Sequence, residues 1–252
     1  MPELKESISL YCKKLKLSSN LAEHAMTQEG DTNQQYLCNL LESEVKYRQE
    51  RRITKLLNTA GFPKIYTPDQ FQTDEIDFPP GVTLQALLDQ DYYHAGKNVL
   101  MYGGTGTGKT MLSILIGIAA CNLGIPASFH RTAGLINAFS ESKAKGTLTA
   151  LKKKLSKSEI LILDEFGYVP YDRTGAQLLF DFLSEIHERK SVILNTNLEF
   201  SQWVNVLYDQ RMTTALIGRL THHVELVLFP VGNHRLQESS INSIIPSGKG
   251  GN

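Results

Sequence analysis

The sequence predicts an α/β fold in which a parallel sheet carries helices on both faces and follows a small all-helical region. Three observations predict it. A glycine-rich octet, GGTGTGKT at residues 103–110, stands between a strand-like and a helix-like apolar run. A second apolar run, residues 160–163, ends in two adjacent carboxylates. Strand-like and helix-like segments alternate along this part of the chain, which is typical of a doubly wound parallel sheet.

The octet matches the phosphate-binding pattern G-x-x-x-x-G-K-[ST] over its whole length. Its glycines let the backbone curl N–H groups around a polyphosphate, Lys109 can reach the β- and γ-phosphates, and the Thr110 hydroxyl can ligate Mg²⁺. The buried helix predicted at residues 111–120 points the positive end of its dipole at the phosphates. We therefore predict that a nucleoside triphosphate binds to Gly103, Gly104, Thr105, Gly106, Thr107, Gly108, Lys109, Thr110 and Met111.

Length and composition indicate one large core plus a small second unit. The chain has 252 residues, of which 41% are hydrophobic and 21% charged, and this composition excludes a disordered protein. The longest apolar run, residues 111–121, is too short to span a bilayer, and no secretory signal is visible. The three cysteines, Cys12, Cys38 and Cys121, have neither disulfide nor metal spacing. We expect reduced thiols in a cytoplasmic protein.

The chain is expected to have four parts: an N-terminal helical domain, residues 1–62; a linker, residues 63–82; a core, residues 83–240; and a flexible tail, residues 241–252. Helices of the first part are predicted over residues 4–17, 21–27 and 32–60. The run Gly61-Phe62-Pro63 ends the last of them. The linker contains several prolines and is irregular, and we expect it to wrap the nucleotide site.

Within the core, the order of segments fits one parallel sheet. Strands are predicted at residues 97–102, 127–130, 160–163, 191–195 and 224–229, and helices at residues 84–92, 111–120, 133–139 and 148–155. After residue 229 there is room for only two helices of average length, about 11–12 residues each, and a Gly/Ser-rich tail takes part of it. We therefore expect no separate C-terminal helical lid.

Two carboxylates, Asp164 and Glu165, follow the apolar run 160–163. Four consecutive large aliphatic residues predict a strand buried on both faces, and ligands of open α/β sheets bind at the carboxyl ends of such strands. After a strand of this kind the first carboxylate holds the Mg²⁺ shell, and the second orients and polarises the attacking water. Asp164 is thus predicted to hold the metal together with Thr110. Glu165 is predicted to activate water, and Lys109 to act on the phosphates.

A further strand, residues 191–195, ends in the polar run Asn195-Thr196-Asn197. A side-chain amide at this strand end would lie between the two carboxylates and the γ-phosphate, and it would report whether that phosphate is present. Asn197 is the first candidate and Asn195 the second, because strand alternation alone does not fix which of them faces the site. Capping of the strand end is the alternative role for both.

The formal net charge is zero, so contact with nucleic acid must come from local clusters. Residues 142–157 contain six lysines and no acidic residue, and such a compact positive segment can meet phosphates. A competing cluster, Arg48, Arg51, Arg52 and Lys55, would form one stripe on a helix. Either cluster can also be an ordinary solvated helix face. The predicted DNA-binding residues are Lys143, Lys145, Lys152, Lys153 and Lys154.

From the octet onward the order of parts resembles the AAA+ ATPases, and more closely the IstB-type transposition helpers and their DnaC-like helicase-loader relatives. The resemblance rests on GGTGTGKT from residue 103, LILDEFGYVPYDRTGAQLLFDFLSEIHERKSVILNTNLEFSQW from residue 161, and TTALIGRLTHHVELV followed by NHRLQES. It implies that Arg219 is the arginine finger completing a neighbouring subunit's ATP site, and that Arg235 matches a late arginine of the family. The chain departs from the family at Gly218, where Asp is common, and at His234, where Tyr is frequent.

The resemblance also implies ATP as the nucleotide, with Phe71, Ile76 and Phe78 near the adenine, and a homo-oligomer in the ATP state. The predicted function is an ATP-hydrolysing, DNA-binding helper that assembles on double-stranded target DNA and recruits or stimulates a transposase. A DnaC-like replicative helicase loader is the alternative, in which the N-terminal helices would hold a helicase. A small-molecule P-loop kinase is the third class, which the Lys-rich segment and the context of Arg219 disfavour.

Overall fold

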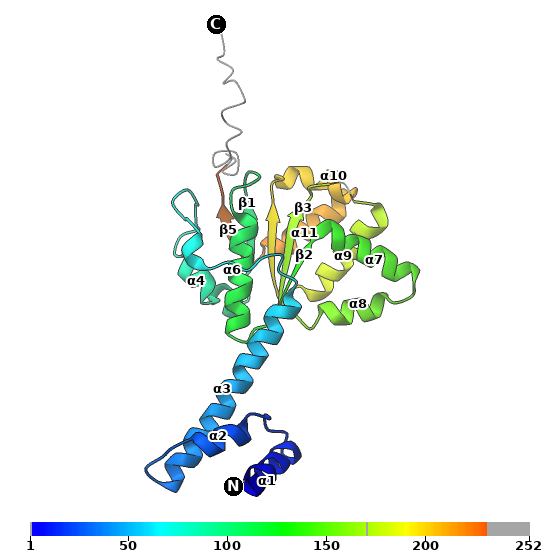
Figure 1. Ribbon diagram of the computed structural model, residues 1–252. Helices are drawn as coiled ribbons and strands as arrows, with labels where there is room; N and C mark the ends of the chain where they lie inside the picture. Colours follow the sequence, from blue (N-terminus) through cyan, green and yellow to red (C-terminus); the bar gives the residue numbers. More distant parts are fainter. Residues whose placement is uncertain (1, 170, 231–252) are drawn as a thin grey trace, which may run out of the picture. The chain divides into compact units, whose positions relative to one another are not determined.

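The first part of the chain is a small helical unit. A computed structural model describes residues 2–169 and 171–230. Two compact units divide the chain, residues 1–58 and 59–252. The first unit consists of α1 (Pro2–Lys14), α2 (Leu21–Thr27) and most of α3 (Asn33–Ala60), drawn in blue in Figure 1.

Apolar packing and a buried carboxylate hold the first unit together. α1 packs on α2, and Cys12, Leu21 and Ala22 are buried between the helices. The Glu44 carboxylate on α3 is buried, and its Oε1 accepts a hydrogen bond from the Ser18 backbone N–H at 2.9 Å. A buried charge needs such partners, and Arg48 supplies the opposite charge to Glu44 at 2.6 Å.

The second unit is built on a five-stranded sheet with the order β2-β3-β4-β1-β5. Each neighbouring pair of strands is parallel, so the predicted parallel sheet is confirmed. The carboxyl ends of all five strands meet at one edge, called the carboxyl edge below. The strands are β1 (Asn98–Tyr102), β2 (Ala127–Arg131), β3 (Ile160–Phe166), β4 (Ser191–Thr196) and β5 (Val224–Leu228).

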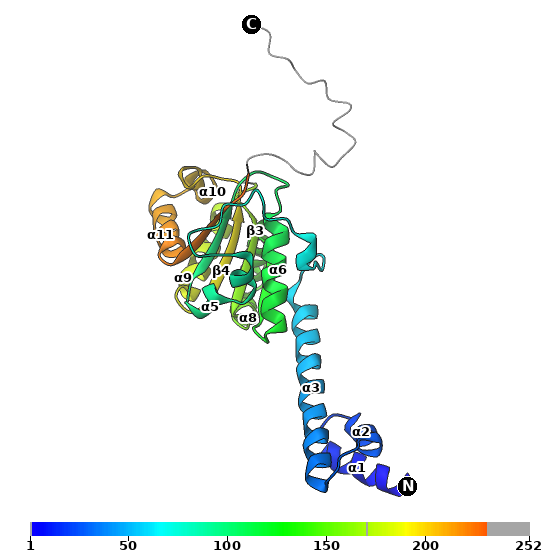
Figure 2. The ribbon, with the colours of Figure 1, turned by 90° about the vertical axis from the view of Figure 1, so that its left-hand side faces the viewer.

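Helices cover both faces of the sheet, and Figure 2 shows the sheet between them. On one face lies α6 (Lys109–Asn122), most of whose side chains are apolar, and Phe62 and Ile162 both pack against it at Gly117. On the other face Phe139, Phe182 and Trp203 belong to the main hydrophobic core. That face is covered by α7 (Thr132–Ala144), α9 (Arg173–Ile186), α10 (Trp203–Leu207) and α11 (Gln210–Thr221).

Two aspartates fix where helices of the second face begin. The Asp172 carboxylate accepts the Gly175 N–H at 2.8 Å at the start of α9, and the Asp209 carboxylate accepts the Met212 N–H at 2.7 Å at the start of α11. α8 (Leu148–Leu155) is followed almost directly by the start of β3. It therefore lies toward the edge where the strands begin, away from the carboxyl edge, as Figure 1 shows.

The segment before β1 contains η1 (Pro68–Gln70), α4 (Leu84–Leu88) and α5 (Asp91–His94). The single helix predicted at residues 84–92 is thus wrong. Gln90 has a left-handed backbone, with φ of 66°, and separates the two helices. Its side-chain amide stabilises this conformation because it donates to backbone carbonyls, including that of Ile116 in α6 at 3.1 Å.

Several expectations concern the chain after residue 230. Arg235, the absence of a C-terminal lid and the tail at residues 241–252 all lie outside the described residues. Within residues 2–169 and 171–230, no helix has the length and apolar character needed to cross a membrane.

Candidate functional site

The octet 103–110 joins β1 to α6 at the carboxyl edge. Two of its glycines are required by the local geometry. Gly103 has φ of 152°, and a Cβ there would lie 2.5 Å from the Phe229 carbonyl oxygen. Gly108 precedes α6 with φ of 105°, and a Cβ there would lie 3.3 Å from the Phe71 ring. The loop is therefore packed between Phe71 and Phe229 in front of the N-terminus of α6, a position suited to an anion.

The Lys109 ammonium lies against the loop that it follows. It donates hydrogen bonds to the carbonyl oxygen of Gly103 at 2.8 Å and to that of Gly104. Lys109 is also the first residue of α6, so its charge adds to the positive end of the helix dipole. Loop amides, helix terminus and ammonium together have the positive character that binding of a polyphosphate requires.

The Thr110 hydroxyl and the Asp164 carboxylate contact each other beside the loop. Thr110 Oγ1 lies 3.1 Å from Asp164 Oδ1 and 3.1 Å from Oδ2, and Asp164 is only 3% exposed. Mg²⁺ takes oxygen ligands and is usually bound by one or two carboxylates plus substrate phosphates, so this pair fits the ion. Elsewhere in the described part of the chain, no group of three or more His, Cys, Asp and Glu side chains could hold a metal.

The two candidate amides of β4 take different positions. Asn195 is buried, and its Nδ2 donates to Asp164 Oδ1 at 2.8 Å and to Ser113 Oγ at 2.9 Å. Asn197 is exposed and lies past the end of the strand. The structure thus brings the second candidate to Asp164 and leaves the first at the surface. Sensing of the γ-phosphate by either amide stays a prediction.

A bulge in β3 separates Glu165 from Asp164. Leu163 pairs with Leu194 and Phe166 with Thr196, so three steps along β3 match two along β4. Glu165 takes a left-handed backbone with φ of 56°, a conformation that costs a non-glycine residue on the order of 1 kcal/mol. Its exposed carboxylate lies 3.7 Å from the Arg131 guanidinium. The bulge therefore turns Glu165 toward solvent while Phe166 returns to the core.

A complete phosphate loop, a Thr110–Asp164 contact and a second carboxylate now stand at one edge of a parallel sheet. The model of the family described as IstB-like ATP binding protein matches residues 11–242 of this chain. The chain belongs to that family. It is 31% identical over 222 residues to the protein named as ATP-binding in insertion sequence IS21 of Pseudomonas aeruginosa, covering 87% of this chain and 82% of the relative. It is 30% identical over 244 residues to the counterpart in IS5376 of Geobacillus stearothermophilus, covering 94% and 97%.

Solved structures share the fold of this IstB-like chain. AMPPCP-bound DnaA from Aquifex aeolicus superposes with a TM-score of 0.55 at 20% identity, over 71% of this chain and 56% of that one. DnaI superposes with a TM-score of 0.51 at 14% identity, over 70% of this chain and 93% of that one. At these identities the likeness shows a shared fold alone.

Arg219 lies in the last turn of α11 in this IstB-like chain. The guanidinium carbon is 5.0 Å from the centroid of the Phe180 ring on α9, and Nη1 is buried without a hydrogen-bond partner among the described residues. The chain enters β5 three residues after α11 ends, so Arg219 lies toward the edge where the strands begin. The phosphate loop lies at the carboxyl edge, so the fold separates Arg219 from the Lys109 and Asp164 of its own chain.

The predicted DNA-binding lysines divide into two groups. Lys145 pairs with Glu141 at 3.3 Å, and Lys152 pairs with Glu185 at 2.9 Å. Lys143, Lys153 and Lys154 make no ion pair with any residue that the structure describes. These three, together with Lys157, therefore carry the uncompensated charge of the segment.

Lys154 also acts on a neighbouring side chain. Burial lowers the pKa of His130 below its ordinary value of 6.5, and the positive charge of Lys154 lowers it further. The His130 ring is thus held neutral near pH 7, at the end of β2.

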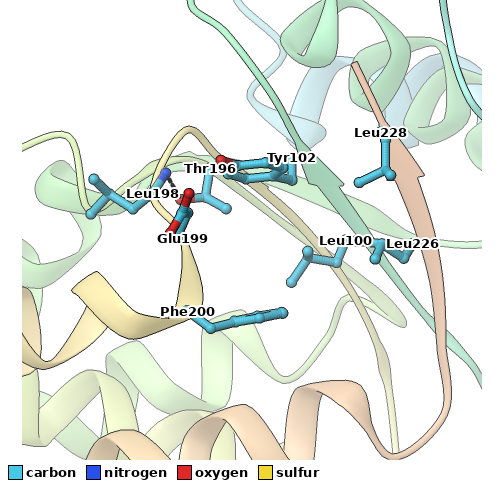
Figure 3. A pocket seen from close by; sticks show the side chains of 8 residues that line it. All are labelled: Leu100, Tyr102, Thr196, Leu198, Glu199, Phe200, Leu226 and Leu228. Carbon is cyan, nitrogen blue, oxygen red and sulfur yellow. Dashed lines mark hydrogen bonds between the residues drawn. The ribbon is translucent and has the colours of Figure 1, made fainter. Parts of the chain in front are cut away.

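A cavity of about 140 Å³ lies on the face of the sheet that α9 and α11 cover, and Figure 3 shows the side chains that line it. Leu100 in its wall belongs to the core shared with α9, whereas Asp164 faces α6 through Thr110. The cavity is therefore not the phosphate site. Its walls are mostly apolar and come from β1, β4, β5 and the segment around η2 (Phe200–Gln202): Leu100, Tyr102, Thr196, Leu198, Glu199, Phe200, Leu226 and Leu228.

Two residues near the site were not predicted from the sequence. Ser113 lies three residues after Thr110 and is fully buried, and Arg131 is the ion-pair partner of Glu165. The sequence could have indicated a buried polar role for Ser113, because it is the one hydroxyl-bearing residue in the otherwise apolar run 111–121. No sequence pattern indicated the ion pair of Arg131, because this pair depends on the order of strands in the sheet.

Proposed function

We propose that this chain is an ATP-hydrolysing helper of DNA transposition, whose ATP-bound copies assemble on double-stranded DNA and recruit or stimulate a transposase. The observation that carries the proposal is the Thr110–Asp164 contact beside a complete phosphate loop. It occurs in a chain whose relatives, matched over most of their length, are named as ATP-binding proteins of insertion sequences. In such a protein, bound ATP would control whether the protein assembles on DNA and recruits the transposase.

The geometry of the carboxyl edge supports hydrolysis as well as binding. Lys109 and the loop amides would hold the β- and γ-phosphates. Mg²⁺, held by Thr110, Asp164 and phosphate oxygens, would neutralise charge on those phosphates. The exposed carboxylate of Glu165 can reach a water at this edge, since its long, solvent-exposed ion pair with Arg131 contributes little stability.

The position of Arg219 supports assembly of several copies. An arginine near the opposite edge of the sheet serves catalysis only if it reaches the phosphate loop of another copy. Contacts of this head-to-tail kind generate rings or filaments. A filament or ring on DNA would array the charges of Lys143, Lys153 and Lys154 along the duplex, and such repetition makes weak phosphate contacts cooperative.

A replicative helicase loader is the alternative, and the relatives favour transposition over it. The family match extends from residue 11 to residue 242 and so includes most of the N-terminal helices, where a loader would hold its helicase. The likeness to DnaI concerns the fold alone. We place the activity in the cytoplasm, because Cys12, Cys38 and Cys121 are all free thiols.

Retention of a partner on DNA tests this function. Immobilised duplex DNA is loaded with the protein and ATP, then exposed to the transposase of the same insertion sequence or to a replicative helicase. We expect ATP-dependent retention of the transposase, and no retention with Lys109→Ala, which lacks the phosphate contact. Retention of the helicase alone would establish the loader instead.

A further inference from the structure

Four residues form a closed ring of hydrogen bonds under the phosphate loop, and the backbone carbonyl of Thr110 is one of the acceptors. Asn195 Nδ2 donates to Asp164 Oδ1 at 2.8 Å and to Ser113 Oγ at 2.9 Å. Ser113 Oγ donates to the Thr110 carbonyl oxygen at 2.9 Å, and Thr110 Oγ1 donates back to Asp164 at 3.1 Å. The ring therefore joins the first turns of α6 to the carboxyl ends of β3 and β4.

The direction of each bond in the ring is fixed by chemistry. An ionised carboxylate only accepts, so Asn195 must present its NH₂ group, not its oxygen, to Asp164. Both N–H groups of that amide are then used, one on Asp164 and one on Ser113. Asn195 Oδ1 is buried and has no hydrogen-bond partner among the described residues. The amide is thus oriented by its two donated bonds alone.

The burial of Asn195 argues against a role in contacting the γ-phosphate. Ser113 is 0% exposed, Asn195 1% and Asp164 3%. To touch a γ-phosphate, the Asn195 amide would have to leave two buried partners, and buried polar groups left without partners destabilise the fold. Asn197 is exposed at the same strand end, so its amide could contact the γ-phosphate without leaving buried partners.

We infer that Asn195, held by Ser113, is a positioning residue that orients the Asp164 carboxylate for the metal ion. The inference rests on the proposed binding of ATP with Mg²⁺. Partners behind a ligating carboxylate set its orientation, and their loss typically costs about 10–100-fold in metal affinity. Asn197 then remains the amide available to the γ-phosphate.

The test separates metal affinity from nucleotide affinity. The non-hydrolysable analogue AMPPCP is bound first in EDTA, and Mg²⁺ is then titrated into the complex while binding is followed by calorimetry. For Asn195→Ala we expect the half-saturating Mg²⁺ concentration to rise about 10-fold. Affinity for AMPPCP in EDTA should stay within about twofold, because Lys109 and the loop amides are unchanged.

Two further variants keep the inference falsifiable. Ser113→Ala removes one hydroxyl in a helix where alanine fits well, and should raise the half-saturating Mg²⁺ concentration by roughly threefold, in keeping with one neutral hydrogen bond. Asn122→Ala, at the exposed C-terminal end of α6, is the matched control and should leave it unchanged. If Asn195→Ala does not fold, as judged by circular dichroism, the Ser113→Ala result decides.

Wild-type Mg²⁺ affinity in the folded Asn195→Ala and Ser113→Ala variants, or an equal loss in Asn122→Ala, would overturn the positioning role. Failure of the wild-type protein to bind AMPPCP at all is a different result, because it would remove the proposed function itself. The wild-type titration therefore comes first.

Discussion

Thr110 Oγ1 lies 3.1 Å from both carboxylate oxygens of Asp164, although the two residues are 54 positions apart in the sequence. The threonine belongs to the first turn of α6 and the aspartate to the carboxyl end of β3. Their contact requires that the phosphate loop and the sheet fold together. The contact between these two predicted metal ligands is therefore set by the fold of the second unit. We expect changes at the loop and at the strand end to have different effects on catalysis.

Loss of Lys109 and loss of the Glu165 charge should separate binding from hydrolysis. Lys109→Ala should abolish ATP binding, since the ammonium is the main positive side chain at the loop. Glu165→Gln should bind ATP normally and lose about 100-fold or more in turnover, the usual contribution of a general base. Equilibrium binding of labelled ATP and phosphate release measure the two effects. A Glu165→Gln protein that cannot bind ATP would remove Glu165 from this role.

Arg219 should act across a subunit boundary. Arg219→Ala and Lys109→Ala should each be inactive alone, with losses of at least about 1,000-fold for the arginine. Mixing them should restore part of the ATPase activity, because some interfaces then combine an intact loop with an intact arginine. Arg211, an exposed arginine at the start of the same helix, gives the matched control as Arg211→Ala. A mixture that stays inactive despite proven co-assembly contradicts the assignment.

The unpaired lysines should carry the DNA contact. Replacing Lys143, Lys153 and Lys154 together with Ala should weaken binding to all duplex sequences alike. It should lower the log–log salt slope by about 0.9 for each true phosphate contact. The control, Lys145→Ala with Lys152→Ala, removes lysines already paired with Glu141 and Glu185 and should change the slope less. An unchanged slope in the triple variant would move the DNA site to the Arg48, Arg51, Arg52 and Lys55 cluster on α3.

His130 should make the fold sensitive to acid. Its pKa is lowered in the folded state, so below pH 6.5 the unfolded chain binds a proton that the folded chain does not. Unfolding free energy should therefore fall as pH drops below 6.5, and the loss should end below the folded pKa. Urea unfolding at pH 7.5 and pH 5.5 measures it. His130→Gln should reduce the difference between the two pH values, whereas His223→Gln, at an exposed histidine, should not.

Local patterns predicted the parts of the site that are contiguous in sequence. The octet 103–110 and the apolar run before Asp164 could each be recognised from consecutive residues alone. Glycine spacing identifies the loop, and a run of aliphatic residues identifies a strand buried on both faces. The choice between Asn195 and Asn197 depends on how β4 aligns with β3 and α6, which no local pattern contains. The bulge at Glu165 lacked a signal for the same reason, since its left-handed backbone occurs without glycine.

Other differences arise from contacts between distant segments. Gln90 breaks the predicted helix because its amide reaches the Ile116 carbonyl, 26 residues away. Lys152 loses its free charge to Glu185, which is 33 residues away and outside the positive segment. The sequence pattern therefore locates the charged segment but contains no signal that Lys145 and Lys152 form ion pairs.

Assembly on DNA in the hydrolysis-deficient protein tests the central claim most directly. Glu165→Gln is sedimented with duplex DNA in the presence of ATP and Mg²⁺, with ADP, and without nucleotide. We predict that large protein–DNA complexes form only with ATP and persist, because the bound nucleotide is not hydrolysed. Complexes of the same size in all three conditions would contradict control of DNA assembly by the ATP site.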